Sequence, residues 1–166
     1  MDKNTELYFV NLMEENQNIL HKICKLYTSD LDAHKDLFQE MVIQLWKAYP
    51  SFKGASKFTT WAYRVALNTA ISLYRERKRK ITTVAWDNSL QNIKYEEYDN
   101  QQEEQLKSLY VAVRQLNDIE KALVYMYLED KDYTEIAETL GISEVNARVK
   151  MNRIKTKLKT MIKQEG

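Results

Sequence analysis

The chain has 166 residues, of which 44% are apolar, 3 are Gly and 1 is Pro, and its 25 basic side chains nearly balance 24 acidic ones. So little Gly and Pro argues against a turn-rich all-β fold and against the loops of a doubly wound α/β fold, whereas the apolar content suffices for a core. Neither a membrane span nor a signal peptide is predicted, so no membrane insertion is expected. Cys24 is the single cysteine, which excludes an intrachain disulfide and fits a cytoplasmic location.

The net charge of +1 conceals a strong segregation of charge along the sequence. Residues 51–80 carry 8 basic and 1 acidic side chains, a net charge of +7, and residues 144–166 carry 7 and 2, a net charge of +5. Residues 81–104 carry 1 and 6, a net charge of −5. Polyanion binding depends on local concentrations of Lys and Arg, so a nucleic acid is a candidate partner. Solvated helix surfaces can also carry such charge runs.

Helical periodicity predicts three helices in residues 1–82. The first covers about 4–28, and the second runs from an N-cap at Asp32 to the break at Pro50. A short loop containing Gly54 follows, and Ser56 is the predicted cap of a third helix that reaches about Lys80. From 83 to 102 the helical period fails and the sequence is polar and acidic, which predicts a flexible linker.

Four helices are predicted in residues 103–166. Their predicted N-caps are Asn117 or Asp118 for the second, Asp132 for the third and Ser143 for the last, which runs to about Ile162. The whole sequence therefore predicts an all-α fold. Two small helical domains, 1–82 and 103–166, are joined by the acidic linker 83–102.

The strongest local signal is a helix-turn-helix over residues 132–153. Ala137 is small where two helices cross, Gly141 suits a turn with positive φ, and Ala147 begins an apolar face that continues through Leu158. The second helix of such a motif fits the DNA major groove, although an ordinary helical hairpin with a basic face is the alternative. Base-edge contacts are predicted for Glu144, Asn146, Arg148 and Lys150, and phosphate contacts for Arg153, Lys155 and Lys157.

The third predicted helix carries a line of polar and cationic residues. Lys57, Arg64, Asn68, Arg75 and Arg79 are separated by 7, 4, 7 and 4 positions, so they share one side of the helix. Such a line can follow the backbone of a DNA strand, and nearby aromatic residues could stack on unpaired bases. For Phe58 and Trp61, packing in the core is the competing interpretation.

These motifs resemble, in the same order, those of the extracytoplasmic-function (ECF) sigma factors, the smallest members of the bacterial sigma-70 family. The similar segments are Asp36-Leu-Phe-Gln-Glu-Met-Val-Ile-Gln-Leu-Trp46, Phe52-Lys-Gly-Ala-Ser-Lys-Phe-Thr-Thr-Trp61, Ala62-Tyr-Arg-Val-Ala-Leu-Asn68 and the helix-turn-helix. The resemblance covers nearly the whole chain. Departures at Ala55, Ala62, Val145, Ala147 and Val149 leave the base preferences of the loop and of the last helix open.

The resemblance implies a sigma factor that binds core RNA polymerase, recognises the −35 and −10 promoter elements and helps to melt the −10 DNA. Implied contacts with the clamp helices of the largest polymerase subunit come from Asp36, Gln39, Glu40 and Gln44. Implied −10 contacts come from Lys53, Ser56, Lys57, Phe58, Arg64, Asn68, Arg75, Arg77 and Arg79. The first domain would serve the −10 element and the last helix the −35 element. Further implied partners are the polymerase flap and an anti-sigma factor, with no cofactor and no metal.

Two other functional classes compete with this interpretation. A conventional helix-turn-helix regulator would bind duplex DNA by itself, usually as a dimer on a palindrome. An enzyme is disfavoured because His21 and His34, the two histidines, lack metal-ligand spacing, and because Gly-rich phosphate loops and a G-x-S-x-G elbow are absent from the sequence.

Overall fold

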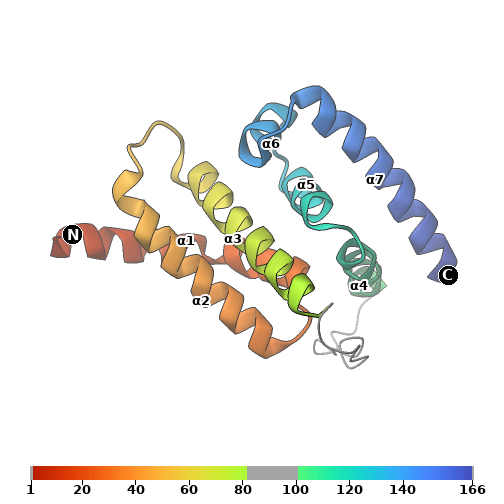
Figure 1. Cartoon of the computed structure of the whole chain (residues 1–166), viewed down its shortest axis with the longest axis horizontal. Coiled ribbons are helices and arrows are strands. Elements are labelled where there is room, and N and C mark those ends of the chain that lie inside the picture. Colours follow the sequence, from red (N-terminus) through yellow and green to blue (C-terminus); the bar gives the residue numbers. More distant parts are fainter. Residues whose placement is uncertain (1, 82–100, 166) are drawn as a thin grey trace. The chain divides into compact units, whose positions relative to one another are not determined.

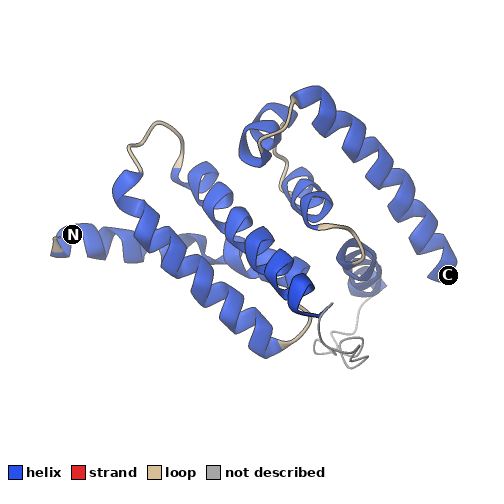
Figure 2. Cartoon of the chain, in the orientation of Figure 1, coloured by secondary structure: helices blue, strands red, loops and turns tan. Residues whose placement is uncertain are grey.

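The computed structural model describes residues 2–81 and 101–165, and every regular element within them is a helix (Figure 2). The described residues form two compact units (Figure 1). We call the unit that ends at Ile81 unit 1 and the one that begins at Gln101 unit 2. The predicted all-helical fold with two domains is confirmed, whereas the linker predicted over 83–102 lies outside the described residues except for its last two.

Unit 1 is a bundle of three long helices, α1 (Lys3–Tyr27), α2 (Leu31–Ala48) and α3 (Phe58–Ile81). The 3-10 turn η1 (Tyr49–Ser51) contains Pro50 and ends α2 as expected. Each of the three helices packs against the other two (Figure 1). Completely or almost completely buried side chains at their meeting line form the core, namely Leu20, Ile23, Met41, Leu45 and Leu67.

Two helix starts in unit 1 differ from the sequence prediction. The carboxylate of Asp30 accepts a hydrogen bond from the Ala33 N–H at 2.7 Å, so Asp30 rather than Asp32 caps α2. The carbonyl of Lys57 accepts the first helical bond of α3, from the Trp61 N–H, so Lys57 rather than Ser56 occupies the cap position. At α2 two aspartates with equal capping ability lie two positions apart, and local sequence does not rank them. At α3 the helix begins one residue later than the Ser56 hydroxyl would favour, a difference within the usual uncertainty of helix ends.

Unit 2 contains α4 (Gln101–Arg114), α5 (Asp118–Leu128), α6 (Tyr133–Leu140) and α7 (Glu144–Glu165). The long helix α7 packs against all three of the others (Figure 1). The core of unit 2 is built from side chains of all four helices, including Val113, Leu123, Met126, Ile136 and Ile154, and from Leu116 in the turn after α4.

The predicted caps in unit 2 are present. Asn117 and Glu120 form a reciprocal capping box at the start of α5, which decides between the two predicted candidates. Asp132 accepts a hydrogen bond from the Glu135 N–H at 2.8 Å, and Ser143 accepts one from the Asn146 N–H at 3.1 Å. None of the helices in the described part of the chain has both the length and the apolar character that a bilayer crossing requires.

Candidate nucleic-acid interface

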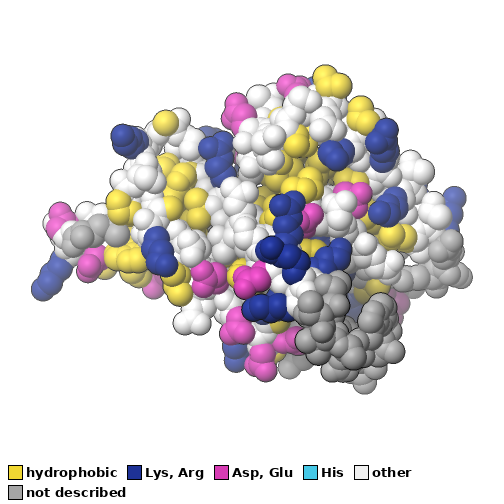
Figure 3. Space-filling view, in the orientation of Figure 1, with side chains coloured by type: hydrophobic (Ala, Val, Ile, Leu, Met, Phe, Trp, Pro, Cys, Tyr) yellow, Lys and Arg dark blue, Asp and Glu magenta, His cyan; other side chains and the backbone are white. Residues whose placement is uncertain are grey.

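The predicted line of cations on α3 lies on the surface of unit 1. Its members, which we call the α3 stripe, are all exposed: Lys57, Arg64, Asn68, Arg75 and Arg79. At 1.5 Å per residue the α3 stripe extends for about 33 Å. The opposite side of α3 buries the small residues Ala62, Ala66 and Ala70, which allow close approach of the neighbouring helices and leave the cations outward. Lys and Arg side chains are prominent over the C-terminal part of α3 and along α7 (Figure 3).

The other predicted −10 residues lie at the two ends of α3. Arg77 is exposed at its C-terminal end, as are Lys78, whose ammonium lies 5.8 Å from the Tyr74 ring centroid, and Lys80, which pairs with Glu76 at 3.3 Å. Lys53 and Ser56 are exposed in the loop before α3. Gly54 in that loop has a φ of 72°, a left-handed conformation that favours glycine.

Aromatic packing holds both ends of this loop. The Phe52 ring centroid lies 6.0 Å from that of Phe58 and 5.1 Å from that of Trp61. Tyr49 contacts both Phe52 and Trp61 at 6.2 Å and extends the cluster to Phe9 at 5.0 Å. Phe58 and Trp61 are half-buried, which supports the packing interpretation for both. The loop is therefore anchored at its ends while its polar tip stays exposed.

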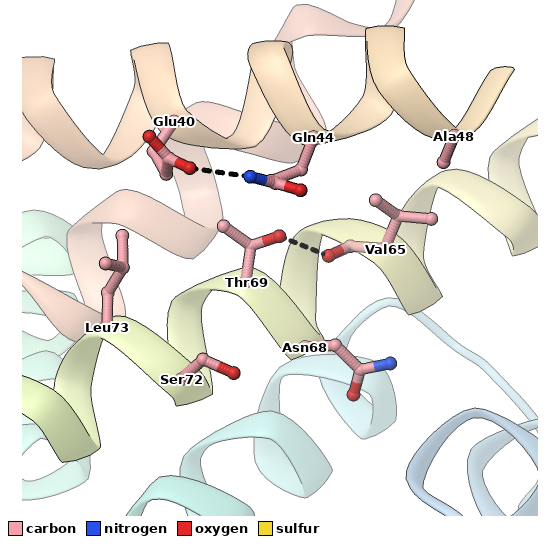
Figure 4. Close-up of a pocket in the computed structure, with 8 residues that line it drawn as sticks. All are labelled: Glu40, Gln44, Ala48, Val65, Asn68, Thr69, Ser72 and Leu73. Atoms are coloured by element: carbon pink, nitrogen blue, oxygen red, sulfur yellow. Dashed lines mark hydrogen bonds between the residues drawn. The ribbon is translucent and has the colours of Figure 1, made fainter.

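An open groove of about 480 Å³ runs between α2 and α3 (Figure 4). On its α2 wall, the Gln44 amide donates a hydrogen bond to the Glu40 carboxylate at 2.7 Å. On the α3 side, the Asn68 amide points away from that pair, and the Thr69 hydroxyl donates to the Val65 carbonyl at 2.8 Å (Figure 4). The groove thus brings together two residues predicted to bind polymerase and one predicted to bind DNA.

The predicted polymerase-binding residues do not form one uniform surface on α2. Asp36 and Gln39 are exposed, whereas Glu40 and Gln44 are half-buried in the groove. Sequence reasoning missed Ile43, which is 38% exposed and shares the polar side of α2 with Gln39. The sequence pattern indicates this exposure, because Ile43 falls outside the apolar face that runs through Leu37, Met41 and Leu45.

The helix-turn-helix is formed by α6, the turn at Gly141 and α7. Gly141 has a φ of 69°, and the Ile142 N–H donates to the Ala137 carbonyl at 3.1 Å, which closes the end of α6. Ala137 and Ala147 are buried where α6 meets α7. The predicted motif is confirmed in its turn, its caps and its small contact residues.

Contacts with α6 fix two of the predicted base-reading residues. Arg148 pairs with Glu144 at 2.7 Å, and its guanidinium carbon lies 5.3 Å from the Tyr133 ring centroid. The Thr134 hydroxyl donates to the other Glu144 oxygen at 3.2 Å. Asn146 is exposed, and Lys150 is half-buried.

The predicted phosphate-binding residues of α7 divide into two groups. The Lys155 ammonium lies 4.5 Å from the Tyr127 ring centroid, and a hydrogen bond with Tyr127 raises the pKa of Lys155 above its ordinary value. Lys157 pairs with Glu120 at 3.5 Å. Both therefore contact α5, and Arg153, one helical turn before Lys157, is exposed. Sequence reasoning gave no contact role to Val145 and Val149, although both are exposed near the start of α7.

Outside these surfaces, the two histidines meet between α1 and α2. His21 Nδ1 and His34 Nε2 lie 3.1 Å apart, and the Cys24 thiol donates to the His34 carbonyl at 3.6 Å. Burial raises the pKa of Cys24 to about 12, which leaves an unreactive thiol. Among the described residues, no group of three or more His, Cys, Asp or Glu side chains is placed to hold a metal.

Comparison with known proteins places both units in one family. The model of sigma-70 region 2 matches residues 12–80, and the model of sigma-70, region 4 matches residues 106–158. RNA polymerase sigma factor YlaC of Bacillus subtilis is 30% identical over 136 residues, which cover 80% of this chain and 79% of that protein. The ECF RNA polymerase sigma-E factor of Haemophilus influenzae is 27% identical over 151 residues, with coverage of 83% and 79%.

Two solved structures share the fold at low sequence identity. The sigma factor RpoE from Bartonella quintana, in complex with the anti-sigma factor NepR, gives a TM-score of 0.72 at 17% identity and covers 98% of both chains. CnrH, in complex with the cytosolic domain of CnrY, gives a TM-score of 0.69 at 16% identity, with coverage of 97% of this chain and 91% of CnrH.

Proposed function

The chain belongs to the sigma-70 family as a member of its ECF group, and from this we propose that its two units recognise two separate promoter elements. As a sigma factor it is not an enzyme; it binds core RNA polymerase and promoter DNA and directs transcription initiation. In the proposal, residues 1–82 serve the −10 element and residues 103–166 the −35 element, with residues 83–102 as the linker. The observation that carries it is the match of region 2 and region 4 to the units that bear the α3 stripe and the helix-turn-helix.

In unit 1, the α3 stripe follows the melted DNA strand. Its cations contact successive phosphates, and Asn68 offers an amide that can read a base edge. The exposed tip of the loop before α3 receives a base that leaves the stack. Extruding a base costs a few kcal/mol, which contacts with the protein must offset. An anchored loop loses less conformational entropy on binding than a free one, so the aromatic cluster supports this role.

The polar side of α2 is the proposed contact with the clamp helices of the polymerase. Asp36 and Gln39 supply exposed polar groups, and Ile43, on the same side of α2, supplies an exposed apolar group. Glu40 and Gln44 are already hydrogen-bonded to each other, so they form a prearranged pair at the border of the DNA-binding side.

In unit 2, α7 enters the major groove of the −35 element and the polymerase flap binds elsewhere on the unit. Asn146 and Arg153 are the exposed polar residues available for bases and phosphates, and Glu144 holds Arg148 in a fixed position. Lys155 and Lys157 contribute positive charge from the α5 side, near the edge of the groove. This arrangement suits a motif whose second helix presents its first turns to the bases.

The proposal extends to regulation and to location in the cell. The sigma factor RpoE, which shares this fold, was solved in complex with the anti-sigma factor NepR, which supports an anti-sigma partner for this chain too. Because its polymerase partner acts on chromosomal DNA, the proposed location is the cytoplasm.

Run-off transcription tests the proposed function. Core RNA polymerase is incubated with a library of native promoter fragments, with and without the chain, and the transcripts are sequenced. We expect discrete start sites that depend on the chain, together with weak binding of duplex DNA by the chain alone. Tight, specific binding by the chain alone without any new start site would instead favour the conventional regulator.

A further inference from the structure

Two valines near the start of α7 expose apolar surface that the fold does not use. Val145 is 70% exposed and Val149 is 42% exposed. The buried side of α7 is formed by Ala147, Met151 and Ile154. At 100° per residue the two valines lie on the opposite side, one helical turn apart, so their side chains are neighbours.

Polar residues surround this valine pair. Asn146 and Arg153 are exposed on one side of it and Asn152 on the other. Arg148 and Glu144 are tied to each other and to α6. The valine pair therefore occupies the centre of the face that a recognition helix turns toward the bases.

The chemistry of the major groove restricts what such a pair can contact. Three of the four bases present only hydrogen-bond donors and acceptors there, whereas thymine presents its C5-methyl group. Valine against a polar base edge would displace water without replacing its hydrogen bonds, which is unfavourable. Two side chains also make a much smaller patch than the several hundred Å² typical of a protein-binding site.

We propose that Val145 and Val149 contact thymine methyl groups and so impose a thymine requirement on the −35 element. This inference rests on the proposed function, in which α7 binds that element. Neighbouring side chains at this spacing lie about 6 Å apart, and base pairs are stacked about 3.4 Å apart. The two thymines therefore lie within three consecutive base pairs.

The experiment removes single methyl groups from DNA. Core RNA polymerase loaded with the full chain first selects active promoters from a library randomised in the −35 and −10 regions. A selected promoter is then synthesised with deoxyuridine in place of each thymine of the −35 element, on either strand, and its affinity for the holoenzyme is measured by competition. We expect roughly a fourfold loss of affinity for each contacted methyl, the value for burying one carbon of that size.

Alanine variants connect the methyl groups to the valines. Val145→Ala and Val149→Ala should each abolish the uracil effect at one thymine and preserve it at the other. Val111→Ala is the matched control, because Val111 is 41% exposed on α4, away from α7's first turns. It should leave both uracil effects unchanged.

Two results would overturn the inference while the proposed function stands. One is a selected −35 element in which no three consecutive base pairs contain two thymines, counted over both strands. The other is a uracil effect that persists in both alanine variants. If the loaded polymerase selects no promoter at all, the proposed function fails first and the inference fails with it, and this result appears before any uracil is introduced.

Discussion

The hydrogen-bonded pair of His21 and His34 makes the stability of unit 1 depend on pH. One ring must donate and the other accept across the 3.1 Å between Nδ1 and Nε2, so the pair does not tolerate a proton on every ring nitrogen. Phe38 stacks on His21 at 4.5 Å, and Lys25 adds a nearby positive charge. Burial, followed by the charges of His21 and Lys25, lowers the pKa of His34. The folded state therefore favours neutral His34.

From this pair we predict that unit 1 loses stability in mild acid. The unfolded chain takes up a proton on His34 near the ordinary pKa of about 6.5, whereas the folded chain does so only at lower pH. The contribution of neutral His34 to the free energy of unfolding is complete above about pH 6.5. It is lost as the pH falls through the lower pKa of the folded state. Urea unfolding at several pH values measures it. Tryptophan fluorescence reports on unit 1 rather than on unit 2, because Trp46 and Trp61 belong to unit 1 and residues 101–165 contain no Trp.

The control for this prediction is His34→Gln, which keeps a polar side chain and cannot gain a proton. Its free energy of unfolding should vary less between about pH 5 and about pH 7.5 than that of the parent chain. An identical pH dependence in the two proteins would show that other groups cause it.

At the scale of the elements, the turn between α6 and α7 depends on Gly141. Its φ of 69° is left-handed, and a Cβ built there meets nothing within 4 Å. The cost of a side chain is therefore backbone strain alone, without a steric clash. Asn tolerates this conformation better than Ala, because its short polar side chain can bond locally.

The corresponding prediction is that Gly141→Ala destabilises unit 2 by about 1–2 kcal/mol and Gly141→Asn by less. For a domain of this size, 1 kcal/mol lowers Tm by roughly 4–8 °C. Thermal unfolding followed by far-ultraviolet circular dichroism measures the change, while the tryptophan signal of unit 1 should stay unaltered. Equal stability of the Ala variant and the parent would contradict the role given to this turn.

The α3 stripe allows DNA melting to be separated from polymerase binding. Arg64→Glu combined with Arg75→Glu should reduce open-complex formation roughly tenfold or more, because two phosphate contacts become repulsions. Binding to core RNA polymerase should stay within about twofold, since the proposed contact surface lies on α2. Lys3→Glu combined with Lys22→Glu changes the net charge equally on α1 and should have little effect. Equal loss of polymerase binding and melting would indicate misfolding instead.

Sequence periodicity and capping rules were sufficient for the helices, because both depend on neighbours along the chain. They placed the cap at Ser143 correctly, offered Asn117 as one of two candidates for α5 and missed Asp30 by two residues. The partners of Lys155 and Lys157 on α5 lie 28 and 37 residues away in sequence, and no local pattern identifies them. The exposure of Val145 likewise depends on which side of α7 the rest of unit 2 covers.

At the scale of the whole molecule, the net charge of +1 results from cancellation between segments. The basic residues are concentrated in 51–80 and 144–166, where the α3 stripe and α7 lie, and the acidic ones in 81–104. Salt screens exposed charges beyond about 10 Å, so the acidic segment affects a basic segment only when it lies close to it. At such a distance its negative charge would weaken the attraction of the basic segment for DNA. A sigma factor built this way should bind DNA poorly until polymerase engages it.

The final prediction tests this cancellation through the five acidic residues Glu96, Glu97, Asp99, Glu103 and Glu104. The first three lie outside the described residues, and Glu104 is exposed. Changing all five to Gln or Asn should raise the affinity of the free chain for duplex DNA, with a larger gain at low salt. The matched control neutralises five exposed acidic residues of α1 and α2, namely Glu6, Glu14, Glu15, Asp32 and Asp36. An equal gain in DNA affinity in both variants would mean that net charge alone matters. No gain in either variant would show that the acidic segment does not weaken DNA binding.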